Sequence, residues 1–220
     1  MKYVGAQPKL YKQRVTLDLA AIPIKVYETD FKLKPELIEK IKNYSFHTDK
    51  DRIKVNLSSS QSILTEYEEL KHIKDYMNAI ALDYVKNVLE IDNDIYMCHS
   101  WVAMTDPGKS HHEHTHQNAF FSIVYYVNVE SGNLNLVVEK SSIEKLFNFH
   151  YKIKNYNIYN SCSWRITPGV GDFIVFPADL RHSTAKNESD QQRIIFGANY
   201  FLSGESGDQI QLTKLDISWP

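Results

Sequence analysis

Five histidines in this chain are spaced in a way that could hold a metal ion. Four of them lie within residues 110–117 and the fifth lies much later in the chain (His111, His112, His114, His116 and His182). His114 and His116 are separated by one residue in a loop that leads into an apolar strand, so both imidazoles can turn toward one point. His182, just past a second predicted strand, would add a third ligand from another part of the fold. Imidazole binds zinc, copper, iron and nickel, and three protein ligands leave coordination positions open, as a catalytic centre requires. A solvated loop that binds metal only adventitiously is the alternative.

An arginine follows His182 within an apolar strand predicted over residues 192–199. Side chains alternate along a strand, so Arg193 and Asn199 share one face with Ile195 and Gly197. An unpaired guanidinium is costly to bury, whereas its planar fork is suited to bidentate binding of a carboxylate. A structural ion pair within the chain would satisfy the same group. The position of Arg193, one strand after a candidate metal ligand, favours the carboxylate of a bound ligand.

The elements that must position these residues fall into two halves. The first half is helical, because Pro35 is a favoured first-turn residue and apolar residues recur at steps of three and four over residues 66–89. After Asn93 the pattern changes to the period of two that is typical of strands. The predicted strands are 15–19, 22–27, 95–104, 119–129, 133–139, 164–167, 172–176 and 192–199. Helices followed by many short strands indicate an α+β chain whose second half is a β-sandwich or barrel.

Composition excludes several classes of protein. The chain has 220 residues, 25 basic and 27 acidic side chains and a formal net charge of −2, so it lacks the footprint of a dedicated nucleic-acid or membrane-surface binder. No apolar run approaches the roughly 18 residues that a membrane span needs, and the first residues lack the apolar stretch of a secretory signal. The two cysteines, Cys98 and Cys162, exclude a disulfide framework and are typical of reduced thiols in a cytoplasmic protein.

These features resemble the 2-oxoglutarate/Fe(II)-dependent oxygenase superfamily, in particular its small members with a histidine-x-histidine motif ahead of an apolar strand. The matching motifs are His114-Thr115-His116, Ser122-Ile123-Val124-Tyr125-Tyr126, Phe176-Pro177, His182, Arg193 and Asn199. The resemblance implies an α+β fold with a double-stranded β-helix core, a cupin-like jelly roll, and N-terminal supporting helices. It implies one domain over residues 1–220, with helical support at about 33–92 and the β-helix core at about 94–202.

The resemblance also implies a metal centre and a cosubstrate. Fe(II) would be held by His114, His182 and a third ligand. His116 occupies the position where the family usually has a carboxylate, and it is the favoured third ligand. Glu113, paired with His111, is the alternative.

The cosubstrate 2-oxoglutarate would take two metal positions, while Arg193 anchors its far carboxylate. Asn199 and Tyr125 would contact the cosubstrate, unless Tyr126 is the tyrosine that points inward. Molecular oxygen would be the second cosubstrate, and a small molecule or a peptide would be hydroxylated as 2-oxoglutarate is converted to succinate. An uncovered sheet edge could support a homodimer. The aromatic segment 143–159 is interpreted as a lid, an oligomer contact or an extra hairpin.

Two other functions fit parts of the pattern. A cupin-type metal protein would share the fold and the histidines, because Gly108 and Gly171 precede them at cupin spacing, although phenylalanine stands where a cupin has its glutamate ligand (Phe120 and Phe121). A non-catalytic protein that retains the barrel is the third possibility. Arg193 discriminates between these functions, because only the oxygenase needs it for a cosubstrate.

Overall fold

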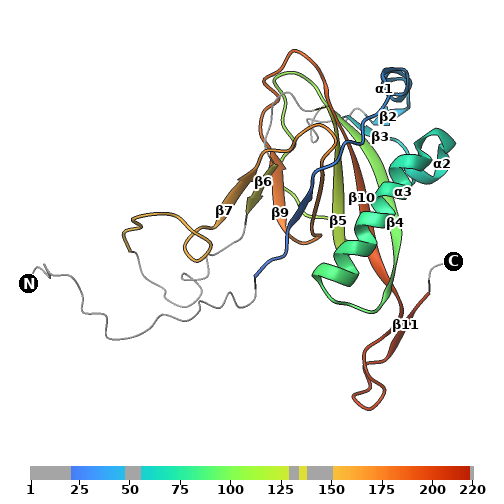
Figure 1. Ribbon diagram of the computed structural model, residues 1–220, viewed down its shortest axis with the longest axis vertical. Helices are drawn as coiled ribbons and strands as arrows, with labels where there is room; N and C mark the ends of the chain where they lie inside the picture. Colours follow the sequence, from blue (N-terminus) through green and yellow to red (C-terminus); the bar gives the residue numbers. More distant parts are fainter. Residues whose placement is uncertain (1–20, 48–55, 129–133, 138–150, 219–220) are drawn as a thin grey trace, which may run out of the picture.

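Two antiparallel sheets make up the core of the molecule. The computed structural model describes residues 21–47, 56–128, 134–137 and 151–218. In this part of the chain the large sheet has the order β1-β8-β5-β10-β4-β3-β2, with β11 paired to the far end of β10, and the small sheet has the order β7-β6-β9. The strands are β1 Lys25–Tyr27, β2 Phe46–His47, β3 Asn56–Ser58, β4 Asp94–Thr105, β5 Phe121–Asn128, β6 Leu134–Val137, β7 Ser163–Ile166, β8 Phe173–Pro177, β9 Arg181–Thr184, β10 Arg193–Ser206 and β11 Leu215–Ile217. Figure 1 shows the small sheet beside the large one, and the β10–β11 hairpin extending from the body of the molecule.

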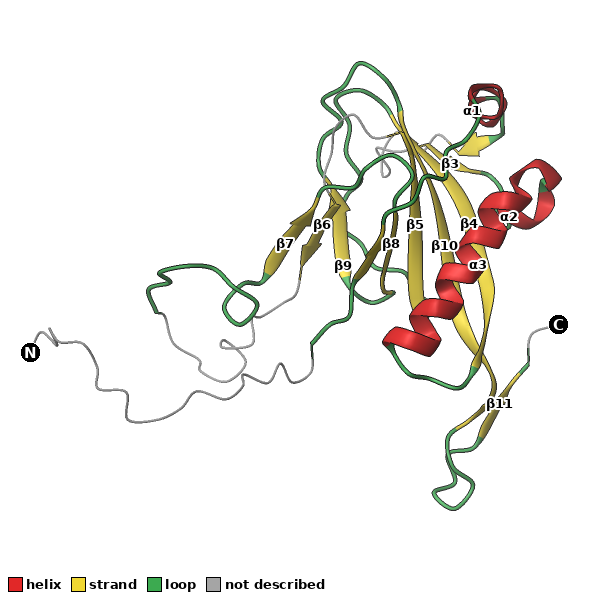
Figure 2. Cartoon of the chain, in the orientation of Figure 1, coloured by secondary structure: helices red, strands yellow, loops and turns green. Residues whose placement is uncertain are grey.

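The helices lie together on one side of the large sheet (Figure 2). They are α1 Pro35–Lys42, α2 Ile63–Glu66 and α3 Lys71–Asp83, with a 3-10 turn at Glu68–Leu70 before α3 and a π-helical turn at Tyr84–Val88 after it. The prediction of one helix over residues 66–89 is therefore largely confirmed. Its first turn is separate, because Tyr67 has extended backbone (φ −111°, ψ 110°). None of the helices in the described residues is long and apolar enough to span a membrane.

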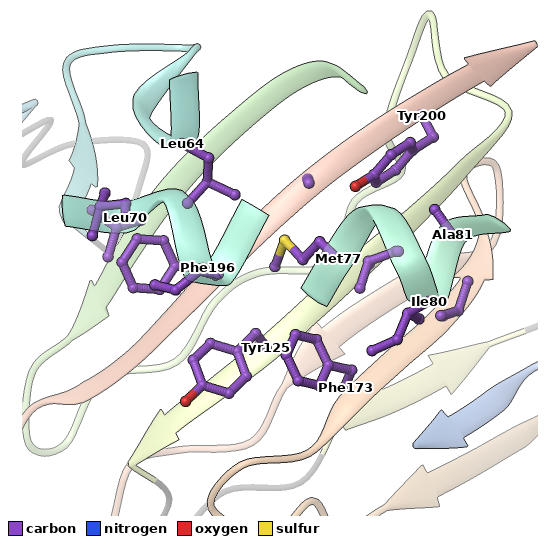
Figure 3. Close-up of a cluster of buried hydrophobic side chains, with 14 of the residues drawn as sticks. Leu64, Leu70, Met77, Ile80, Ala81, Tyr125, Phe173, Phe196 and Tyr200 are labelled. Carbon is purple, nitrogen blue, oxygen red and sulfur yellow. The ribbon is translucent and has the colours of Figure 1, made fainter. Parts of the chain in front are cut away.

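The larger hydrophobic cluster lies between these helices and the outer face of the large sheet. Leu70, Met77 and Ile80 of the helical segment pack against Phe196 and Tyr200 of β10, together with aromatic residues of β5 and β8, as Figure 3 shows. The apolar stripe read from the sequence is the face that is buried here. Burial of such a stripe supplies most of the stability of a helix in a protein.

The inner face of the large sheet meets the small sheet. Val124 and Tyr126 of β5 form a second cluster with Ile174 and Phe176 of β8 and Leu134 of β6. Side chains alternate along β10. Ile194, Phe196 and Ala198 face the helices, so Arg193 and Asn199 point to this inner face. The predicted division of that strand into two faces is confirmed, and it places the candidate site between the sheets.

Some elements differ from the sequence-based expectation. His182 lies just past the strand β8, as predicted, but it is part of a further strand, β9, that was not predicted. The strand β10 continues well past residue 199 to Ser206. The predicted strand 15–19 lies outside the described residues. Of the aromatic segment 143–159, only residues 151–159 are described, and they contain bends and a turn but no helix or strand.

Candidate metal centre

The backbone brings three of the predicted histidines together. His114 and His182 form an antiparallel bridge, in which the amide N–H of each donates to the carbonyl oxygen of the other at 3.0 Å. His116 is held by its amide N–H, which donates to the carbonyl oxygen of Ala178 at 2.8 Å. One ligand nitrogen from each of the three imidazoles lies within 4.8 Å of the other two. The loop before β5 and the strand β9 therefore present three imidazoles to a single point.

Hydrogen bonds at Nδ1 fix the orientation of each ring. Nδ1 of His182 lies 2.9 Å from the carbonyl oxygen of Leu180, and Nδ1 of His114 lies 2.8 Å from that of His112. A carbonyl oxygen can only accept, so both Nδ1 atoms carry a proton when these bonds form. In each ring Nε2 then keeps its lone pair, which is the state that a metal ligand needs.

His116 is oriented by two side chains that sequence reasoning did not connect with it. Its Nδ1 lies 2.8 Å from Oδ1 of Asn199 and 2.6 Å from Oγ of Ser122, and the Ser122 hydroxyl donates to the same Oδ1 at 2.8 Å. The Ser122 hydroxyl has one hydrogen, and it is donated to Asn199. The hydrogen bonds of His116 Nδ1 to these two side chains therefore require a proton on Nδ1. Asn199, predicted to contact a cosubstrate, thus supports a candidate metal ligand. Ser122 begins one of the motifs that carry the family resemblance, but no role was predicted for it.

The three imidazoles fit a divalent cation. Nε2 of His116 lies 3.3 Å from Nε2 of His114, so two unprotonated nitrogens face each other at close range. Burial, together with the neighbouring imidazoles, lowers the pKa of His182 to about 3 and that of His116 to about 4. The rings are therefore neutral near pH 7, and a cation among them would satisfy lone pairs that otherwise repel.

The same burial predicts a pH-dependent stability of the metal-free protein. In the unfolded chain both histidines bind a proton below about pH 6.5, whereas in the folded chain they stay neutral down to about pH 4. The unfolded state thus binds more protons in this range, and the free energy of unfolding falls as the pH drops. We expect a loss on the order of a few kcal/mol between pH 7 and pH 4.5, measured by urea unfolding.

A double variant, His116→Gln with His182→Asn, serves as the control for this prediction. It removes these two groups and leaves His111 and His114, whose pKa values burial also lowers, so its free energy of unfolding should still decline but less steeply over the same range. Identical slopes for the variant and the wild-type chain would contradict the assignment of the decline to these two histidines.

Glu113, the alternative metal ligand, lies outside both groups of potential ligands in the described residues. Its carboxylate forms an ion pair with Arg181 of β9, and both side chains are exposed. The pair of Glu113 and His111 is therefore not brought together as a ligand set. His111 instead lies against His114, with ring centroids 4.2 Å apart.

Arg193 lies on the inner face near the centre. It is only 4% exposed, and its guanidinium donates to Oγ1 of Thr184 at 2.8 Å and to the carbonyl oxygen of Ala185 at 3.2 Å. Thr184 and His182 lie on one face of β9, a two-residue step of about 7 Å apart. The guanidinium is thus anchored on the strand that also carries His182. Burial lowers its pKa, and its electrostatic interaction with Tyr126 opposes that shift.

Tyr125 is the predicted site residue that the structure does not bring to the centre. Its ring packs on Phe173 and Phe31 under the helices, with centroids 4.6 Å and 5.4 Å away, and its hydroxyl donates to the carbonyl oxygen of Phe31. Figure 3 shows it among the residues of the helix-covered core. Tyr126 is the inward-facing tyrosine of β5, and it belongs to the cluster between the sheets.

A cavity of about 500 Å³ adjoins the centre. Its lining includes Trp101 and Asn199 along with serine, glutamine and histidine side chains of β2, β3, β4 and the loop after β3. The indole of Trp101 stands edge-on to His116, with ring centroids 5.2 Å apart. It lies flat over Gly197, where an added Cβ would meet the indole at 2.3 Å. A glycine on β10 is therefore what allows this aromatic wall to stand beside the histidines.

Comparison with known proteins finds one matching family. The sequence pattern of the family described as "Putative 2OG-Fe(II) oxygenase" matches residues 99–199, the stretch that contains the three histidines of the centre and Arg193. Among curated proteins, no sequence matches this chain.

Solved structures of low sequence identity share the fold. A prolyl-4-hydroxylase from Pseudomonas putida is 13% identical with a TM-score of 0.56, and the match covers 85% of this chain and 96% of that one. HygX from Streptomyces hygroscopicus, solved with nickel, 2-oxoglutarate and hygromycin B, is 9% identical with a TM-score of 0.55, and the match covers 81% and 82%. An oxidoreductase of the 2OG-Fe(II) oxygenase family from Burkholderia pseudomallei is 9% identical with a TM-score of 0.54, and the match covers 80% and 83%. The predicted double-stranded β-helix is thereby confirmed.

Proposed function

We propose that this chain is a 2-oxoglutarate- and Fe(II)-dependent dioxygenase of the 2OG-Fe(II) oxygenase family, whose sequence pattern matches residues 99–199, and that it hydroxylates a small-molecule or peptide substrate. The observation that carries the proposal is the convergence of three imidazoles, one of them on the strand β9, whose Thr184 also anchors a buried guanidinium. Three imidazoles on one side of an iron ion would leave positions for a cosubstrate and for oxygen. Bound iron would supply the oxidising chemistry, which couples decarboxylation of 2-oxoglutarate to insertion of oxygen into a C–H bond.

The residues of this chain would hold the reactants in place. His114, His116 and His182 would bind the metal through Nε2, because their Nδ1 atoms are engaged by Leu180, His112, Asn199 and Ser122. Partners of this kind fix the tautomer of a ligating histidine and raise its basicity. Asn199 and Ser122 are thus positioning residues for His116.

Arg193 would bind the far carboxylate of 2-oxoglutarate. Thr184 and Ala185 orient the guanidinium, and the aromatic and aliphatic neighbours around Tyr126 exclude water from it. A charge-assisted bond in a buried setting is stronger than one in water. The hydroxyl of Tyr126, on the same inner face, is a candidate for a further bond to this carboxylate.

The cavity beside Trp101 would receive the substrate. It reaches Asn199, whose side chain touches His116, so a molecule in the cavity would lie next to the metal. Among the similar structures, HygX was solved with hygromycin B, and a prolyl hydroxylase from Trichoplax adhaerens was solved with a peptide fragment. These relatives support a small molecule or a peptide as the class of substrate.

An anaerobic titration tests the proposal. The metal-free protein is mixed with Fe(II) and then with 2-oxoglutarate, and the visible spectrum is followed for a metal-to-ligand charge-transfer band. We expect a band that saturates at one equivalent of 2-oxoglutarate, because the 2-oxo and C1 carboxylate oxygens would chelate the iron.

Other outcomes would contradict the proposal. Tight binding of iron without the band would favour a cupin-type metal protein that does not use 2-oxoglutarate. Failure to bind iron would leave a β-helix protein without this activity.

A further inference from the structure

The proposed metal centre continues outward into two imidazoles that the oxygenase reaction does not use. The ring of His111 lies 4.2 Å from that of His114 and 5.1 Å from that of His112, measured between centroids. His112 and His114 are 5.3 Å apart by the same measure. One ligand nitrogen from each of these three residues lies within 4.8 Å of the other two. The described residues thus contain a second group of three potential ligands, and it shares His114 with the first.

The two groups differ in exposure. His112 is exposed and His111 is half-buried, whereas His182, in the inner group, is only 4% exposed. The rings of His114 and His182 are 4.3 Å apart, so imidazoles are in contact from the solvent to the buried centre. A metal ion that arrives from solution would meet the outer group first.

The outer group is fixed relative to the inner one. The amide N–H of His111 donates to Oγ1 of Thr184 at 2.9 Å, and the amide N–H of Thr184 donates to the carbonyl oxygen of His111 at 3.2 Å. The strand β9, which carries His182, therefore positions His111 as well as His114. Backbone hydrogen bonds to β9 thus fix His111 and His114 of the outer group relative to His182.

We propose that His111, His112 and His114 form a capture site through which a divalent transition-metal ion reaches the inner centre. The proposal rests on the proposed metal centre formed by His114, His116 and His182. Because His114 belongs to both groups, two ions cannot each have a full set of ligands, so the outer group would serve transit and not storage. An ion that keeps His114 as a ligand could exchange the two outer imidazoles for the two inner ones one at a time. Imidazole is a suitable ligand for the iron, zinc, copper and nickel ions that such a site would take.

The experiment follows the loading of the metal-free, full-length protein with Co(II), which remains divalent during handling. Trp101 stands beside His116, so a paramagnetic ion in the inner centre should quench tryptophan fluorescence, and stopped-flow mixing gives the loading rate constant. Release is measured by mixing the cobalt-loaded protein with excess EDTA. The test variant is His111→Ala with His112→Ala. The matched control, His72→Ala, removes an exposed imidazole on α3, away from the centre and the cavity.

We expect the test variant to load at least five-fold more slowly, while its equilibrium dissociation constant for one Co(II) changes less than two-fold. Detailed balance then requires release to slow by the same factor as loading. A purely structural effect of the substitutions would not produce this parallel change in both rates. The control variant should load and release like the wild-type chain. The single variant His112→Ala changes only an exposed side chain, so it replaces the double variant if that one does not fold. Its loading rate constant should lie between those of the wild-type chain and the double variant.

Three results would overturn the proposal. Unchanged loading and release in both test variants would exclude a transit role. Loss of tight Co(II) binding on removal of His111 and His112 would place them in the primary site. A second tight equivalent of Co(II) in the wild-type chain would show an independent site. Failure of the wild-type chain to bind Co(II) would be distinct from all of these, because it would refute the inner centre itself.

Discussion

Replacement of His182 with alanine is expected to abolish tight, stoichiometric binding of metal. His182 is the most deeply buried of the three candidate ligands, and it is the one supplied by the opposite sheet. Without it, only His114 and His116 remain, both from one short loop. Loss of a single supporting residue around a metal ligand already costs about 10- to 100-fold in affinity, so loss of a ligand should cost more than about 100-fold. Calorimetric titration of the metal-free protein with Co(II) measures the effect.

Two further variants make this prediction decisive. His72→Ala removes an exposed histidine from α3 and should leave the affinity for Co(II) unchanged. His182→Asn keeps an N–H that can donate to the carbonyl oxygen of Leu180, so it separates loss of the ligand from damage to the fold. One tightly bound Co(II) retained by a folded His182 variant would mean that the ligands lie elsewhere.

Local sequence patterns were sufficient to place His114 beside His116 and to put Arg193 and Asn199 on one face of a strand, because these signals are short in range. The spacing of His114 and His116 and the alternation along residues 192–199 each depend on a few neighbouring residues. The strand β9 was missed for the opposite reason. Its sequence, Arg-His-Ser-Thr, has no apolar alternation, and it forms a strand by pairing with the distant β6.

The choice between Tyr125 and Tyr126 shows a second limit. Residues 119–127 are almost continuously apolar, and β5 is buried on both faces. A strand of this kind has no period from which an inner and an outer face can be read. The same limit applies to Ser122 and Asn199, whose hydrogen bonds to His116 join three segments and depend on the pairing of β5 with β10.

Replacement of Arg193 with alanine is expected to weaken binding of 2-oxoglutarate while leaving the metal centre intact. The guanidinium is bound through Thr184 and Ala185, and none of its hydrogen bonds described above involves a histidine of the centre. Removal of one partner of a buried, hydrogen-bonded charge pair costs about 2–5 kcal/mol, which corresponds to about a 30- to 5,000-fold weaker dissociation constant. Titration of the charge-transfer band of the iron-loaded protein gives that constant. For Arg193→Lys we expect a dissociation constant between those of the wild-type chain and Arg193→Ala, because lysine keeps the charge and lacks the planar fork.

Pyruvate provides an internal control for the role of Arg193, because it has the 2-oxo acid group that would chelate the metal but lacks the far carboxylate. The wild-type chain should bind 2-oxoglutarate far more tightly than pyruvate, and Arg193→Ala should remove most of that difference. Because pyruvate cannot reach the guanidinium, its own affinity should hardly change in the variant. Equal weakening of both compounds would mean that the substitution disturbs the metal centre. An undiminished preference for 2-oxoglutarate would show that another residue binds the far carboxylate, and the assignment of Arg193 would then be wrong.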